Sequence, residues 1–341
     1  MKVLIVRVGA MGDVLHALPA VAALQEARPD WTIDWVVDPR WAPLLVNGEG
    51  KGPVVDRVHL AETKMWSKAP ASVATLRSVL ELREALRSEQ YDLAVDMQGT
   101  LRSAVIGRMA RTKEFAGYAD PRESLAARFY GTRLQRNGQH VVEQGAALLG
   151  EACGVELTAG SVELPHEEWA DHWAAEVVGD RPTCLLTAGG GWAAKHWPAE
   201  RFGALAMELN ATGMQVVVNA PRENDALAAM VVGASEGAAR VVVCNVTGLI
   251  ALMRRMTLLV GGDSGPMHMA AALGVPVVAL FGPTDPARNG PWGPGASAVL
   301  RDPASVTSYK HVAEMDPGLA RISAEAVMDA VRAVLSEARG A

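Results

Sequence analysis

The stretch KVLIVRVGAMGDVLHALPA, residues 2–20, reads as a strand, a turn with two glycines and an apolar helix. Its strand part does not alternate polar and apolar residues, which is typical of a parallel strand covered on both faces. Similar apolar runs lie at residues 33–37, 54–60 and 91–99, with an amphipathic segment at residues 73–90. This order predicts a doubly wound α/β sheet in the first half of the chain.

The same pattern restarts after a polar segment at residues 154–181 that contains proline and tryptophan. A chain of 341 residues is long enough for two domains of about 150 residues each. We therefore expect two Rossmann-like domains, residues 1–160 and 161–320, followed by a helix at residues 321–341. Ligands of such sheets bind beyond the carboxyl ends of the strands, so the two lobes are expected to face a central cleft.

The composition is that of a globular protein, with 50% hydrophobic and 21% charged residues. Cys153, Cys184 and Cys244 are far apart and form no CxxC pair, which favours buried reduced thiols and a cytoplasmic location. The longest apolar stretch, residues 269–282, is interrupted by glycine and proline, so we expect no membrane-spanning segment.

Basic residues gather between residues 99 and 138, although the net charge of the chain is −6. Eight of them face three acids there: Arg102, Arg108, Arg111, Lys113, Arg122, Arg128, Arg133 and Arg136. They form either a solvated helix face or a basic wall for an anionic partner. The acidic balance of the whole chain and the limited interleaving of aromatic with basic residues argue against nucleic acid as that partner.

The turn after the first strand matches neither the GxGxxG nor the GxxxxGK[ST] nucleotide-binding pattern. Asp13 is expected at the N-cap of the following helix, where it either caps the helix or projects into the cleft as an ionised base. His16, one turn further on, is expected to be a packed helix residue more than a catalytic one.

A second loop, TAGGGWAAKHWP, follows the first strand of the second half. Its glycines, Gly189 to Gly191, expose backbone N–H groups to an anion, and Lys195 adds a positive charge. Together they suit a diphosphate, unless the glycines serve only as a flexible connection.

A third loop, GGDSGPMHM, places Ser264 and Gly265 at the start of a helix, a position that binds phosphate. Asp263 would repel a phosphate, so we expect it to hold sugar hydroxyls or to orient Lys195. His268 lies one turn inside the helix and, taken alone, reads as a buried histidine with a neighbouring partner.

The chain contains no DxD or HExxH sequence and no Cys/His cluster with the spacing of metal ligands. We expect metal-independent chemistry without a cofactor.

MGDVLHALPAVAALQ, KHWP and DSGPMHMAAALGVPVVALFGPTDP resemble motifs of the ADP-heptose:lipopolysaccharide heptosyltransferases. This family consists of inverting glycosyltransferases with the two-lobed GT-B fold. DVLHALP, DMQGTLRSA and PRESLAARFYG most resemble the branch that adds the first heptose to the Kdo sugar of lipid A. The resemblance extends from Met11 to Pro286.

The resemblance implies that Asp13 is the general base for the acceptor hydroxyl and that Lys195 binds the donor phosphates. The donor-binding residues that it implies are Gly190, Gly191, Glu223, Asp263, Ser264, Gly265 and His268, with Glu223 at the nucleoside. The acceptor-binding residues that it implies are Gly12, Lys64, Arg102, Arg122 and His140. Some members carry hydroxyl residues where this chain has Gly9, Ala10, Gly190 and Gly191, so contacts there would come from the backbone.

The implied partners are ADP-heptose, an acceptor of the Kdo-lipid A type and the cytoplasmic face of the inner membrane, touched peripherally. The two lobes are expected to close over the donor. The alternatives are a family relative with another acceptor or nucleotide sugar, a nucleotide-sugar epimerase and a sugar-nucleotide binding protein without activity.

Overall fold

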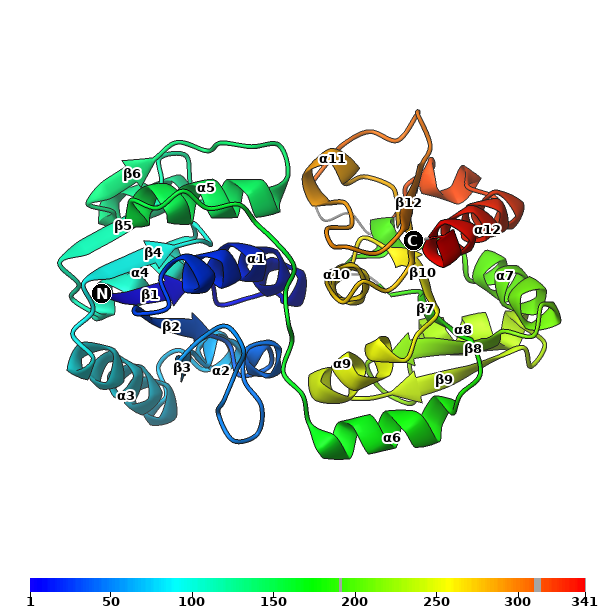
Figure 1. Cartoon of the computed structure of the whole chain (residues 1–341), viewed down its shortest axis with the longest axis horizontal. Helices are drawn as coiled ribbons and strands as arrows, with labels where there is room; N and C mark the ends of the chain where they lie inside the picture. Colours follow the sequence, from blue (N-terminus) through cyan, green and yellow to red (C-terminus); the bar gives the residue numbers. More distant parts are fainter. Residues whose placement is uncertain (190–191, 310–313, 341) are drawn as a thin grey trace. The chain divides into compact units, whose positions relative to one another are not determined.

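The computed structural model describes residues 1–189, 192–309 and 314–340. The chain divides into two compact units, Met1–Pro165 and His166–Ala341. Each unit is an α/β structure built on its own sheet (Figure 1).

The sheet of the first unit has six parallel strands in the order β3-β2-β1-β4-β5-β6. The strands are β1 (Lys2–Val6), β2 (Thr32–Val37), β3 (Arg57–Leu60), β4 (Leu93–Asp96), β5 (Glu114–Tyr118) and β6 (Thr132–Leu134). The parallel sheet predicted from the unbroken apolar runs is confirmed. Strands β5 and β6 were not predicted, because they are short and polar residues surround them.

Helices cover both faces of this sheet (Figure 1). They are α1 (Met11–Ala27), α2 (Thr63–Lys68), α3 (Val73–Ser88), α4 (Leu101–Met109) and α5 (Val141–Cys153), with short 3-10 segments η1 (Ala42–Leu44) and η2 (Ser124–Phe129). Helix α1 packs against α5, whereas α4 packs against α3 and η2.

The second unit repeats this topology with six parallel strands in the order β12-β11-β10-β7-β8-β9. The strands are β7 (Thr183–Thr187), β8 (Gln215–Ala220), β9 (Ala239–Val243), β10 (Leu258–Gly262), β11 (Val277–Phe281) and β12 (Ser297–Arg301). Numbered within each unit, both sheets have the order 3-2-1-4-5-6, the order of dinucleotide-binding Rossmann folds. The expectation of two doubly wound α/β units is confirmed.

Six of the helices described in the second unit pack in two groups of three. They are α6 (Glu168–Val178), α7 (Ala199–Ala211), α8 (Ala226–Ala234), α9 (Val246–Arg254), α10 (Gly265–Ala272), α11 (Pro286–Asn289) and α12 (Ala324–Gly340), with η3 (Ala193–Lys195) and η4 (Leu319–Arg321). Helices α7, α8 and α12 pack together, as do α6, α9 and α10. Helix α6 lies inside the segment that we expected to be a polar connection, and α8 begins four residues after the expected start at Arg222.

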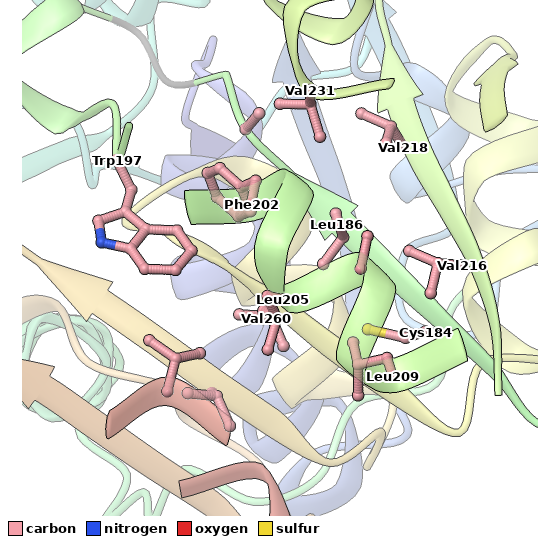
Figure 2. Close-up of a cluster of buried hydrophobic side chains, with 14 of the residues drawn as sticks. Cys184, Leu186, Trp197, Phe202, Leu205, Leu209, Val216, Val218, Val231 and Val260 are labelled. Carbon is pink, nitrogen blue, oxygen red and sulfur yellow. The ribbon is translucent and has the colours of Figure 1, made fainter. Parts of the chain in front are cut away.

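The core of the second unit shows why its strands are apolar throughout. Alternate residues such as Cys184 and Leu186 of β7 point toward α7, where they meet Phe202 and Leu205 (Figure 2). The intervening Leu185 is equally buried on the opposite face of the sheet. Burial on both faces explains the absence of polar alternation.

The cysteines are free thiols, as expected. The expectation that all three are buried is wrong for Cys153 and Cys244, which are half-buried, while Cys184 is fully buried. Cys153 ends its helix and Cys244 follows a strand, so each lies at the margin of a core. Burial still raises the pKa of the Cys153 and Cys244 thiols to about 12. Within the described residues, no helix combines the length and the apolarity needed to cross a bilayer.

Candidate active site

The predicted site residues gather at the carboxyl edges of the two sheets, where open parallel sheets bind ligands. In the first unit, Gly12 and Asp13 follow β1, Lys64 follows β3, Arg102 follows β4, Arg122 follows β5 and His140 follows β6. In the second unit, Lys195 follows β7, Glu223 follows β8, and Asp263, Ser264, Gly265 and His268 follow β10. The strand order reverses between β1 and β4 and between β7 and β10. Asp13 and Arg102 therefore flank the first reversal, and Lys195 and Asp263 flank the second.

Asp13 does not occupy the N-cap position that we expected. Helix α1 begins at Met11, so Asp13 is its third residue, and Asp13 Oδ2 accepts a hydrogen bond from the N–H of Ala10 at 3.1 Å. Ala10 takes the N-cap position instead, with extended backbone (φ −74°, ψ −172°). Gly9 before it has φ +153°, and a Cβ there would lie 2.6 Å from Nε1 of Trp41. The carboxylate thus caps the first turn while a third of its surface stays exposed.

Arg7 is a residue of this site that the sequence reasoning missed. Its Nη2 lies 3.0 Å from Oδ1 of Asp13, its Nε donates to the carbonyl oxygen of Asp13 at 3.1 Å, and its Nη1 donates to the carbonyl oxygen of Met97. The side chain therefore joins the loop after β1 to the loop after β4. The available signal was a charged residue that interrupts the apolar run immediately before the glycine turn.

Asp96, the last residue of β4, holds the neighbouring loop. Its carboxylate accepts hydrogen bonds from the N–H groups of Gln98 and Gly99 at 2.8 and 3.0 Å. It also accepts from the hydroxyls of Ser103 and Tyr130 at 2.8 and 2.7 Å. Burial raises the pKa of Asp96, and these donors oppose that rise. This network fixes the first turn of α4, and with it the positions of the side chains that this turn carries.

The imidazole rings of His16 and His140 meet edge to face, with centroids 5.7 Å apart. His16 is buried in α1, as expected for a packed residue. His140 caps α5, because its Nδ1 accepts a hydrogen bond from the N–H of Val142 at 3.2 Å. An accepting Nδ1 leaves Nε2–H as the donor of a neutral ring.

The basic stretch belongs to several elements and not to one helix face. Arg102 and Arg108 lie on α4 and Arg128 on η2, all with exposed side chains. Arg136 instead stacks on the ring of Tyr118 at 4.0 Å. Lys64 and Arg122 are exposed in the segments after β3 and β5.

In the second unit, Asp263 lies between two cationic or potentially cationic groups. Its Oδ2 is 2.5 Å from Nζ of Lys195, and its Oδ1 is 3.1 Å from Nε2 of His268. All three side chains are largely buried. Although burial opposes ionisation, the hydrogen bond from His268 and the charges of His268 and Lys195 hold the pKa of Asp263 well below its usual range. Asp263 therefore stays ionised and holds Lys195 beside the start of α10.

Close backbone approach brings the loops after β7 and β10 together. A Cβ on Gly261 would lie 1.8 Å from Oγ1 of Thr187, and one on Gly262 would lie 2.9 Å from the carbonyl oxygen of Lys195. Ser264 is the N-cap of α10, which confirms the predicted helix start.

Three buried hydroxyls at this edge have no hydrogen-bond partner within the described residues: those of Thr187, Ser264 and Thr284. They end or follow β7, β10 and β11 respectively. Buried polar groups are normally paired, so unpaired ones at a sheet's carboxyl edge point to a polar ligand. Thr187 and Thr284 were not predicted, because only burial distinguishes them from ordinary loop hydroxyls.

Glu223 is exposed in the turn after β8. Gly190 and Gly191, which were predicted to bind a diphosphate through their backbone, lie outside the residues that the structure describes. In the described parts of the chain, no three His, Cys, Asp or Glu side chains group as a metal site would require.

Two Rossmann-like units of identical strand order fit the GT-B fold of glycosyltransferases, and solved heptosyltransferases share this architecture. The E. coli heptosyltransferase WaaC, solved with ADP-2-deoxy-2-fluoro heptose, has 27% sequence identity and a TM-score of 0.77, covering 98% of this chain and 99% of that chain.

Comparison of sequences narrows this class. Lipopolysaccharide heptosyltransferase 1 of Pseudomonas aeruginosa is 31% identical over 300 residues, 86% of this chain and 82% of that protein. Lipopolysaccharide heptosyltransferase 1 of Escherichia coli K12 is 31% identical over 312 residues, 86% of this chain and 91% of that protein. The family model of glycosyltransferase family 9 (heptosyltransferase) matches residues 79–316. The chain belongs to glycosyltransferase family 9 and is a glycosyltransferase.

Proposed function

We propose that this enzyme is a heptosyltransferase I, which transfers L-glycero-D-manno-heptose from ADP-heptose to the Kdo of the lipopolysaccharide inner core with inversion. The relatives named lipopolysaccharide heptosyltransferase 1 support this assignment, as does the likeness to a heptosyltransferase solved with an ADP-heptose analogue. The single observation that carries it is the buried Lys195–Asp263–His268 group beside three unpaired hydroxyls at the edge of the second sheet.

The second unit binds the donor in this proposal. Lys195 and the N-terminus of α10 meet the diphosphate, and Ser264 and Gly265 contribute their N–H groups and the Ser264 hydroxyl. Asp263 is buried and binds Lys195 through one carboxylate oxygen and His268 through the other, so in this proposal it orients Lys195 and His268. Glu223 binds the nucleoside. Gly190 and Gly191 complete the diphosphate site through their backbone.

The first unit binds the acceptor. Lys64, Arg102 and Arg122 offer exposed cations to the carboxylate and phosphates of a Kdo-lipid A type acceptor. Gly12 allows close approach at the first turn of α1, and His140 caps α5 at the same edge of the sheet.

Transfer proceeds as a direct displacement. Asp13 accepts the proton of the acceptor hydroxyl, and the hydroxyl oxygen bonds to the anomeric carbon of heptose. The bond from that carbon to the donor phosphate breaks, and its electron pair leaves with ADP. Lys195 and the start of α10 stabilise the charge that develops on the leaving phosphate.

The proposed function is tested by ADP release. We expect release from ADP-heptose in the presence of Kdo-lipid A and none without it, since water is a poor substitute for a bound acceptor. A panel of other nucleotide sugars tests the donor. Turnover of donor without acceptor would indicate an epimerase, and preference for an acceptor that already carries heptose would indicate a heptosyltransferase II.

We also propose that the enzyme works at the cytoplasmic face of the inner membrane and touches it through a surface on α3, α4 and η2. Six exposed aliphatic side chains define this surface: Val73, Leu76, Leu80, Leu101, Val105 and Leu125. Val73 is 77% and Leu76 is 60% exposed, and the exposed Arg102, Arg108 and Arg128 lie on the same elements. Aliphatic side chains beside cations suit an anionic bilayer.

Vesicle sedimentation tests this contact. Replacing both Leu76 and Leu80 by Glu is expected to lower partitioning into phosphatidylglycerol vesicles at least about tenfold, because each buried leucine contributes about 1.5–3 kcal/mol. Met230→Glu, an equally exposed position on α8, is the matched control and should have no effect. Equal loss in both variants would exclude the α3–α4–η2 surface.

A further inference from the structure

Arg7 uses its whole guanidinium at the switch point of the first sheet. Its Nη2 contacts the carboxylate of Asp13, its Nε the main-chain oxygen of Asp13 and its Nη1 the main-chain oxygen of Met97. The backbone of Arg7 is held equally well, because its N–H donates to Val36 at 3.3 Å and its carbonyl oxygen accepts from Nε1 of Trp35 at 2.9 Å. Only 15% of the side chain surface is exposed, so the guanidinium is largely shielded from solvent.

These contacts fix the orientation of one carboxylate. A free Asp side chain rotates broadly about its last torsion. Here Arg7 holds Oδ1 of Asp13 and the Ala10 N–H holds Oδ2, so the plane of the carboxylate is set from both sides. Each oxygen accepts about two hydrogen bonds, which leaves lone pairs on both for a substrate hydroxyl.

The hydrogen bond from Arg7 to the carbonyl oxygen of Met97 also holds the loop after β4. Met97 precedes Gln98, whose Oε1 in turn accepts from the N–H of Val8 at 2.8 Å. The loops after β1 and β4 are therefore tied in both directions, so Asp13 keeps a fixed place relative to the start of α4.

We infer that Arg7 is a positioning residue for transfer, which acts through Asp13 by holding its carboxylate in the reactive orientation. This inference rests on the proposed role of Asp13 as the general base. Because misplacement of a reacting group by about 1 Å costs about 100-fold in rate, loss of Arg7 should appear in kcat and not in donor binding.

A double-mutant cycle on the full-length enzyme tests the inference. Arg7→Gln is expected to lower kcat for ADP release by about 10- to 100-fold, with KM for ADP-heptose nearly unchanged. Arg7→Lys, which keeps the charge but only one donor group, should retain an intermediate rate. Arg28→Met is the matched control, because Arg28 follows the other end of α1 and lies over the ring of Trp31.

The decisive comparison is made in the Asp13→Asn background. If Arg7 acts through Asp13, then Arg7→Gln causes no further loss there. An equal loss in both backgrounds, or no loss in the wild type, would overturn the role of Arg7 while leaving Asp13 in place. Asp13→Asn with the wild-type rate would instead overturn the proposed base, and the inference with it. Should Arg7→Gln not fold, Arg7→Lys is carried through the same cycle and read in the same way.

Discussion

Asp263 shows how much a single side chain organises at the donor edge. Its two oxygens hold Lys195 and His268, and this pairing outweighs the cost of burying the carboxylate. The cation that the proposed reaction needs is therefore held in place before any diphosphate arrives. In the proposed function, the unpaired hydroxyls at the same sheet edge offer further polar contacts to the donor.

The low pKa of Asp263 makes a prediction about stability. A carboxyl group whose pKa is lower in the folded state than its ordinary value of 3.8 stabilises the fold above that pH, and this contribution is lost as the pH falls. Asp263→Asn should therefore be less stable than the wild type by about 3 kcal/mol at pH 7, because it leaves Lys195 buried without a counter-charge. The difference in unfolding free energy between Asp263→Asn and the wild type should become smaller below about pH 4.

Urea unfolding at several pH values between about 7 and 3 measures this difference. Glu337→Gln, an exposed position on α12, is the control and should match the wild type throughout. A gap between Asp263→Asn and wild type that stays constant down to pH 3 would contradict the role given to the ionised carboxylate.

Residue types and their place after a strand singled out Asp13, Lys195 and Asp263 as candidates, and the resemblance of the motifs gave them the roles that stay predictions here. They were not enough to find Arg7 or Asp96, because the contacts that define these two residues reach across neighbouring strands. Arg7 and Met97 are adjacent only once β1 and β4 have paired. The assignment of Asp13 to the N-cap failed for a local reason, since the helix starts directly after the turn at Gly9.

At the scale of elements, the long apolar strands and the amphipathic helices could be predicted from the sequence, whereas β5, β6 and β12 could not. Those three strands alternate or carry charged residues, as in SAVLR of β12. Their place in the sheet comes from pairing with a neighbour, such as β11 for β12, and not from their own pattern. Helix α6 was missed because its segment is rich in charged residues and follows a proline.

Helix packing makes a prediction with a matched pair of glycines. A Cβ on Gly203 of α7 would lie 2.6 Å from backbone atoms of Ala234 of α8, whereas one on Gly233 of α8 would meet nothing within 4 Å. Gly203→Ala should destabilise the protein by about 1–3 kcal/mol, because the backbone of α8 must move. Gly233→Ala should stabilise it by up to about 1 kcal/mol.

Urea unfolding of both variants checks this packing. The two changes add the same methyl group to helices of one unit, so helix propensity acts alike in both. Equal shifts in the two unfolding midpoints would mean that the close contact of α7 and α8 does not govern stability there.

At the scale of the whole molecule, the same sheet topology occurs twice, but the two sheets carry different polar groups at their carboxyl edges. The edge of the first sheet carries an ion-paired carboxylate and exposed cations, and the edge of the second carries a buried lysine and unpaired hydroxyls. The repeat was visible in the sequence because each unit restarts with an apolar strand and a glycine-containing loop. We propose that the first unit binds the acceptor and the second unit binds the donor because of the side chains at these two edges.

The most direct test measures donor affinity and turnover on the same samples of Asp13→Asn and Lys195→Met. The account predicts that Asp13→Asn binds ADP-2-deoxy-2-fluoro heptose as the wild type does, yet loses about 10²- to 10⁴-fold in kcat with ADP-heptose and Kdo-lipid A. Lys195→Met should lose both affinity and rate, because its charge meets the diphosphate before and during bond cleavage. Equal weakening of donor binding in both variants, or an unchanged rate for Asp13→Asn, would contradict the account.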